Sequence, residues 1–145
     1  MIENEDLGLL TERQNDRKFG GEFAFFRLRS RTEIEKMYSE RAPDDVTLII
    51  EKKDGTKIGV VYIITFKHGG YTPLTEIGYL LIPSERGKGY GTETVGITLD
   101  YTFLLSPVPR IQAITNEKNI ASQRVLGKNG FKKEGTIRKY YFQWG

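Results

Sequence analysis

A glycine-rich turn lies between an apolar run of strand length and a segment of helical composition. The turn comprises Arg86, Gly87, Lys88, Gly89, Tyr90, Gly91 and Thr92. Because glycine has no side chain, the backbone N–H groups of such a turn can closely approach one point. The N-terminus of the following helix adds partial positive charge at the same place. A turn of this kind between a strand and a helix predicts a phosphate-binding site.

The spacing of the glycines excludes two common nucleotide-binding signatures. The string G-x-x-x-x-G-K-[ST] does not occur in the sequence. In the dinucleotide pattern G-x-G-x-x-G, Gly87 and Gly89 supply the first two glycines, but Thr92 stands where the third is required. The pattern that fits is R-x-x-G-x-G, formed by Arg86, Gly89 and Gly91. Taken alone, it is also compatible with a connection that binds no ligand.

The elements that must position this turn are predicted by hydrophobic periodicity and by turn residues. Strands are expected at Val46–Glu51, Lys57–Phe66, Thr75–Ile82 and Ile111–Thr115, and a further extended segment at Phe131–Trp144. Helices are expected at Asp6–Asp16, after the capping box of Ser30 and Glu33, at Thr92–Leu105, and at Ile120–Asn129 before Gly130. Phe19–Phe26 and Lys67–Pro73 are expected to be loops.

Strands interrupted by helices, together with a tight Asp54-Gly55 hairpin, predict a mixed α/β sheet. If the strands Thr75–Ile82 and Ile111–Thr115 are neighbours, the helix between them makes them parallel, with a right-handed crossover. The length of 145 residues and the absence of a linker or repeat predict a single domain over residues 1–145.

Composition excludes several classes of site. The sequence has no cysteine and one histidine, His68, so neither a metal site nor a Ser-His-Asp triad is expected. The net charge of +3 is spread along the chain, without the basic stripe typical of nucleic-acid-binding proteins. No apolar run is long enough to span a bilayer, and the acidic N-terminus lacks a signal-peptide pattern. A cytoplasmic protein without nucleic-acid or membrane partners is therefore expected.

The glycine turn resembles the pyrophosphate-binding motif of the GNAT acyl-CoA N-acyltransferases. Its surroundings, Glu76–Tyr79 before it and Asn116–Ser122 after it, resemble the RimJ/RimL branch of that superfamily, and Gly130-Phe131 follows in register. The resemblance covers nearly the whole chain and implies a GNAT-like fold. At the ends the sequence departs from the family, because no strand precedes the first helix and none follows Trp144-Gly145. We expect a fold that lacks the first and last strands, as in a chain trimmed at both ends.

The resemblance implies that acetyl-CoA is the cosubstrate and a primary amine the acceptor, either a protein N-terminus or a small amine. Acetyl-CoA would lie in a V-shaped gap where the strand Thr75–Ile82 splays from Ile111–Thr115. The residues implied to bind it are Leu80, Leu81, Ile82, Arg86, Gly87, Lys88, Gly89, Tyr90, Gly91, Thr92, Asn119 and Ser122. An absent edge strand would leave unpaired backbone groups, so pairing with a second copy as a homodimer is also expected.

The resemblance also implies the catalytic groups. Glu76 is the expected base for the amine, although it could equally be a strand-end carboxylate in solvent. The tyrosine that usually protonates the thiolate in the family is replaced here by Leu126, so Ser122 is the expected proton donor. Asn119 would bind the pantetheine or order a water. Asn119 and Ser122 also suit plain capping of the helix Ile120–Asn129.

Two functions therefore remain open from the sequence. The first is an acetyl-CoA-dependent N-acetyltransferase in which the amine attacks the thioester directly. The second is a non-catalytic acyl-CoA-binding or interaction module on the same fold, since the usual tyrosine acid and the terminal strands are missing. A nucleic-acid binder is a third class, which would require salt-sensitive binding.

Overall fold

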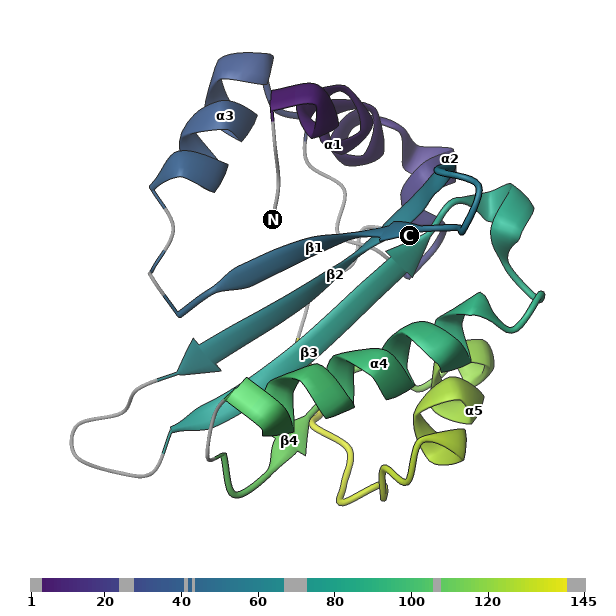
Figure 1. Ribbon diagram of the computed structural model, residues 1–145. Coiled ribbons are helices and arrows are strands. Elements are labelled where there is room, and N and C mark those ends of the chain that lie inside the picture. Colours follow the sequence, from purple (N-terminus) through teal and green to yellow (C-terminus); the bar gives the residue numbers. More distant parts are fainter. Residues whose placement is uncertain are drawn as a thin grey trace.

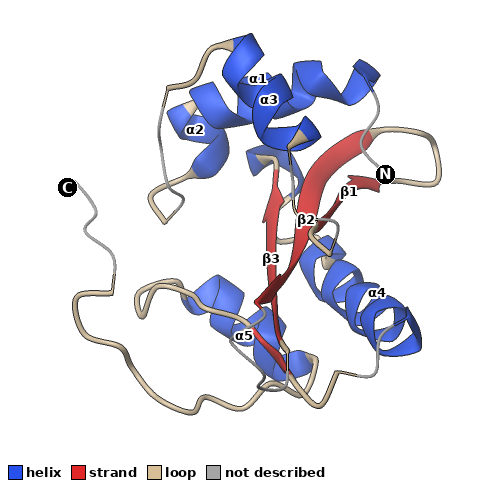
Figure 2. Cartoon of the chain, turned by 90° about the vertical axis from the view of Figure 1, so that its left-hand side faces the viewer, coloured by secondary structure: helices blue, strands red, loops and turns tan. Residues whose placement is uncertain are grey.

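The computed structural model describes residues 4–23, 28–40, 42, 44–66, 73–105 and 108–140. A four-stranded sheet in the order β1-β2-β3-β4 occupies the centre of the protein (Figure 1). Its strands are β1 (Val46–Glu51), β2 (Lys57–Phe66), β3 (Leu74–Leu81) and β4 (Ile111–Gln112). One face is covered by α1 (Leu7–Asn15), α2 (Arg17–Gly20) and α3 (Arg31–Ser39), and the other by α4 (Tyr90–Leu105) and α5 (Ile120–Lys128) (Figure 2). Two short 3-10 turns, η1 (Asn4–Asp6) and η2 (Pro83–Glu85), complete the elements.

The pairing of the strands confirms the predicted mixed sheet. Strands β1 and β2 form an antiparallel hairpin around Asp54-Gly55, and β2 pairs antiparallel with β3. Strand β4 pairs parallel with β3 after the crossover through α4, as predicted. The predicted strand Ile111–Thr115 was too long, because only Thr75 with Ile111 and Glu76 with Gln112 pair before the two strands separate.

Each face of the sheet has its own apolar core. On the α1 and α3 side, Leu7, Leu10, Ile34 and Val60 are buried, and Leu80 packs against them. On the α4 side, Ile63, Ile77 and Val95 form the buried cluster, and it is contacted by Tyr79. Because side chains alternate along a strand, Glu76 shares the face of Leu80, whereas Tyr79 and Leu81 lie on the side of α4 and α5.

The ends of the chain differ from the expectation in two places. Helix α2 forms where an irregular segment was expected from Phe19, because the carboxylate of Asp16 accepts the Lys18 N–H at 2.7 Å and caps the turn. The extended segment expected after Phe131 joins no strand between residues 131 and 140, and Lys139 has a positive φ of 53°. Within the described residues, no strand precedes α1 or follows α5. Residues 24–26 of the first predicted loop, residues 67–72 of the second and the C-terminal residues 141–145 lie outside the described residues.

The predicted capping box begins α3. The Ser30 N–H donates to Glu33 Oε2 at 2.7 Å, and the Glu33 N–H donates to Ser30 Oγ at 3.2 Å. Since two otherwise unpaired backbone donors are satisfied, Ser30→Ala should lower the free energy of unfolding by about 1 kcal/mol. Urea denaturation measures this change. Thr32→Ala, an exposed position in the same turn, is the control, and an equal loss in that variant would contradict the assignment.

Candidate functional site

The glycine turn presents a row of backbone donors at the N-terminus of α4. Gly87 and Gly89 have φ values of 74° and 93°, a left-handed conformation that favours glycine. Within the described residues, none of the five N–H groups from Gly87 to Gly91 donates a hydrogen bond, and the first that does is that of Thr92, to Gly89 O at 3.0 Å. Successive donors in such a turn, at a helix N-terminus, form an anion-binding concavity.

Arg86 fixes this turn to the rest of the fold. Its Nε donates to Leu81 O at 2.9 Å, and its Nη2 donates to Phe19 O at 2.5 Å. The guanidinium thus joins the end of β3 to α2, and desolvation by burial lowers the pKa of Arg86. The sequence predicted that the charge of Arg86 binds a phosphate. In the structure its side chain donates hydrogen bonds to the carbonyl oxygens of Leu81 and Phe19. Lys88 is more exposed and lies 3.3 Å from the carboxylate of Glu85.

A fork opens between β3 and β4 beside the glycine turn. Only two residue pairs join the strands, so the β3 edge beyond Glu76 has no strand beside it within the described residues. The Ile82 N–H donates to Ile58 O at 2.9 Å, toward β2. Because hydrogen-bonding direction alternates in an antiparallel ladder, Leu80 also points to β2, while Tyr79 and Leu81 point toward the fork. Of the three residues expected to pair with pantetheine, Leu81 is therefore the one whose N–H faces it.

Glu76 lies where the fork closes. Its Oε2 accepts a hydrogen bond from Gln112 Nε2 at 2.8 Å, and the Glu76 side chain is half-buried. Gln112 Oε1 in turn accepts from Arg110 Nη2 at 3.4 Å. The carboxylate is thus held by a neutral amide rather than by an ion pair, which leaves Oε1 available as an acceptor.

Asn119 and Ser122 lie at the N-terminus of α5. Asn119 Oδ1 accepts the Ser122 N–H at 3.0 Å, so the predicted cap is present. The Ser122 hydroxyl is 3.1 Å from the hydroxyl of Tyr79, which reaches across from β3. Leu126, at the position of the family's usual tyrosine, is buried. Sequence reasoning did not select Tyr79, although alternation with Ile77 and Leu81 could have placed it on the α5 side of the sheet.

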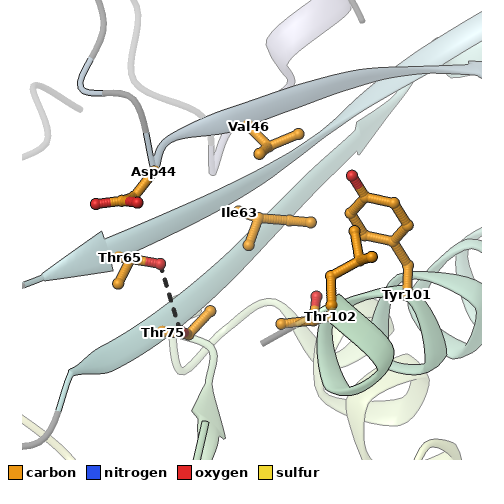
Figure 3. Close-up of a pocket in the computed structure, with 8 residues that line it drawn as sticks. Asp44, Val46, Ile63, Thr65, Thr75, Tyr101 and Thr102 are labelled. Atoms are coloured by element: carbon orange, nitrogen blue, oxygen red, sulfur yellow. Dashed lines mark hydrogen bonds between the residues drawn. The ribbon is translucent and has the colours of Figure 1, made fainter. Parts of the chain in front are cut away.

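A small pocket lies between the sheet and α4. The pocket has a volume of about 80 Å³ and is lined by Val46, Ile63, Thr75, Tyr101 and Thr102 among others (Figure 3). None of the predicted site residues lines it.

The described residues contain no cluster of three or more His, Cys, Asp or Glu side chains that could hold a metal. Among them there is also no helix long and apolar enough to cross a membrane.

Comparison with known protein families identifies the family to which the chain belongs. A family model described as "Acetyltransferase (GNAT) domain" matches residues 2–132. The chain belongs to the GNAT acetyltransferase family. The relatives that it matches are named N-acetyltransferases, and the chain is therefore assigned to this class of enzyme. "Probable N-acetyltransferase YjcK" of Bacillus subtilis (strain 168) is 34% identical over 144 residues, which cover 93% of this chain and 77% of that protein.

Two further comparisons involve spermidine acetyltransferases. The GNAT chain is 26% identical over 89 residues to spermidine N(1)-acetyltransferase of Escherichia coli (strain K12), covering 61% of this chain and 47% of that one. The crystal structure of spermidine N-acetyltransferase from Vibrio cholerae in complex with CoA and spermine superposes with a TM-score of 0.88 at 22% identity. The superposition covers 99% of this chain and 85% of that chain, which confirms the GNAT-like fold.

Proposed function

We propose that this GNAT acetyltransferase transfers an acetyl group from acetyl-CoA to a primary amine. The observation that carries the proposal is the row of unbonded N–H groups from Gly87 to Gly91 beside the fork between β3 and β4. A diphosphate fits such a row, since it offers several oxygen acceptors to converging donors. The pantetheine arm, which carries amides, would then run along the β3 edge past the Leu81 N–H.

The residues around the fork supply the groups that acyl transfer requires. The amine nitrogen attacks the thioester carbonyl, a C–N bond forms, and the C–S bond breaks as the tetrahedral intermediate collapses. Glu76 takes the proton of the attacking amine, directly or through a water. A backbone N–H of β3 at the fork stabilises the developing oxyanion. Ser122 gives a proton to the departing thiolate, and Asn119 keeps Ser122 in place through its N–H.

We propose a small amine as the acceptor to test first. Two kinds of observation support it: the named relatives include spermidine acetyltransferases, and the Glu76 carboxylate lies next to the fork. A protein N-terminal amine is the alternative acceptor, and it would fit the RimJ/RimL-like segments Glu76–Tyr79 and Asn116–Ser122. Pairing of two copies through the outer edge of β1 is a further proposal, which sedimentation of the purified protein tests.

Acetyl-CoA turnover followed as released thiol tests the function directly. The panel should contain spermidine, spermine, single amino acids and peptides with free N-termini, each against an N-blocked counterpart. Calorimetry with CoA alone runs in parallel. Thiol release that depends on a free amine supports the enzyme. CoA binding without release for any acceptor favours the non-catalytic acyl-CoA-binding module, and no heat with CoA overturns both.

Arg86 offers a test of how the turn is held. If Arg86 acts by joining Leu81 O to Phe19 O, Arg86→Lys should weaken CoA binding about tenfold, because a single ammonium cannot reproduce the guanidinium's two contacts. Isothermal titration with CoA measures the change, and Arg110→Lys, an exposed arginine, is the matched control. If Arg86→Lys binds CoA with wild-type affinity, the positive charge at position 86, and not the two hydrogen bonds of the guanidinium, is what CoA binding requires.

A further inference from the structure

A pair of hydroxyl groups bridges β3 and α5 at the fork. The Tyr79 hydroxyl lies 3.1 Å from Ser122 Oγ, and the Tyr79 ring packs where β3 meets α4 and α5. Its Cε2 lies 3.5 Å from the position that a Cβ on Gly91 would take. The phenol is therefore held by packing beside the glycine turn, while its oxygen reaches the first turn of α5.

We propose that Tyr79 is a proton-relay and positioning residue that acts through Ser122 on the departing thiolate. The inference rests on the proposed function and deepens it. In this protein the residue at the family's usual acid position, Leu126, is a buried apolar side chain with no proton to give. The structure assigns that task to a tyrosine that comes from β3 instead of α5.

The chemistry of the two hydroxyls gives the direction of the relay. A phenol loses its proton far more readily than an aliphatic hydroxyl, so Tyr79 is the donor in the pair and Ser122 Oγ the acceptor. The proton of Ser122 is then free to point to a third atom. Burial raises the pKa of Tyr79 above its ordinary value, so the phenol is protonated at neutral pH and is a weaker acid than a free tyrosine.

The proposed step balances without an outside reactant. As the C–S bond breaks, the Ser122 O–H bond breaks and an S–H bond forms on the thiolate. At the same time the Tyr79 O–H bond breaks and its proton moves to Ser122 Oγ, so no serine alkoxide forms. The negative charge ends on the Tyr79 phenolate, which water reprotonates after the proton of the amine has left through Glu76. A serine acting alone would have to form an alkoxide, which is a much stronger base than a thiolate.

Three variants test the relay: Tyr79→Phe, Ser122→Ala and the double variant. Tyr79→Phe keeps the ring and should lower kcat about tenfold, because Ser122 must then protonate the thiolate without a second donor behind it, with KM for acetyl-CoA within about twofold of wild type. The double variant should be no slower than Ser122→Ala, since Tyr79 acts only through Ser122. A proton inventory in mixed H2O and D2O should change from curved in wild type to linear in Tyr79→Phe. Tyr101→Phe, in the pocket of Figure 3, is the control for loss of a phenol hydroxyl.

The outcomes separate the relay from the function on which it rests. Wild-type kcat in Tyr79→Phe, or single losses that multiply in the double variant, would overturn the relay while leaving Ser122 as the donor. Wild-type kcat in Ser122→Ala would overturn both the donor role of Ser122 and the relay, with amine acetylation itself intact. A fall in kcat with an unchanged proton inventory would reduce Tyr79 to a packing residue and so overturn the relay.

Discussion

Gly89→Ala should weaken acetyl-CoA binding about 100-fold while leaving the protein folded. Gly89 has a φ of 93°, a conformation that alanine adopts only with strain, and relief of that strain turns the neighbouring N–H groups away from their common side. An added Cβ would meet no protein atom within 4 Å, so the folded chain itself accommodates the methyl group. Isothermal titration with CoA measures the loss, and it should appear in the binding constant rather than in the fraction of folded protein.

The β1–β2 hairpin provides a matched control for this prediction. Gly55 also has a positive φ, 85°, and a Cβ there would likewise meet nothing within 4 Å. Gly55→Ala should therefore cost about the same stability, on the order of 1 kcal/mol, without any effect on CoA binding. Equal CoA affinity in the two variants would contradict the assignment of the glycine turn as the diphosphate site.

Glu76→Gln should lower kcat/KM for acetyl transfer about 1,000-fold at neutral pH. The amide keeps the shape of the side chain and a partner for Gln112, but it cannot accept the proton of the attacking amine. The deficit should shrink as the pH rises toward the pKa of the acceptor, because more of the free amine is then already deprotonated. Thiol release measured from pH 6 to pH 10 with the acceptor below saturation gives the profile.

The control for Glu76 is another glutamate on a strand. Glu51 ends β1, is exposed and lies on the far side of the sheet from the fork, so Glu51→Gln should leave the profile unchanged. Thermal unfolding of both variants checks that each is folded. A Glu76→Gln enzyme with the wild-type profile would make Glu76 the solvated strand-end carboxylate that the sequence also allowed.

Local signals in the sequence predicted the elements closest to the site. The Asp54-Gly55 turn and the flanking β-branched runs located β1 and β2 at their observed bounds, and the Ser30 capping box started α3 where expected. Pro83 marked the end of β3, and the glycines that follow gave the turn. These features depend on residues within a few positions of one another, which is why a single sequence contains them.

Features that depend on contacts between distant segments were not predictable. No pattern of neighbouring residues predicts that β4 stops pairing with β3 after Gln112. None predicts that Arg86 donates to the carbonyl oxygen of Phe19, or that the hydroxyls of Tyr79 and Ser122 lie within hydrogen-bonding distance. Each of these contacts joins residues at least 35 positions apart, and each is set by how the helices dock on the sheet. The family resemblance supplied roles for Glu76 and Ser122, but it could not supply the phenol between β3 and α5.

The brevity of the β3–β4 ladder has an energetic consequence. A coenzyme that enters this fork breaks no strand pairing, because the fold has already separated the two strands beyond their second rung. The conformational entropy cost of separating the two strands is part of folding. Less of the binding free energy is therefore lost to ordering the fork when a cosubstrate binds. If acetyl-CoA binds as proposed, with its diphosphate at the N-terminus of α4 and its pantetheine along the edge of β3, substitutions at these two places should change the affinity for each end separately.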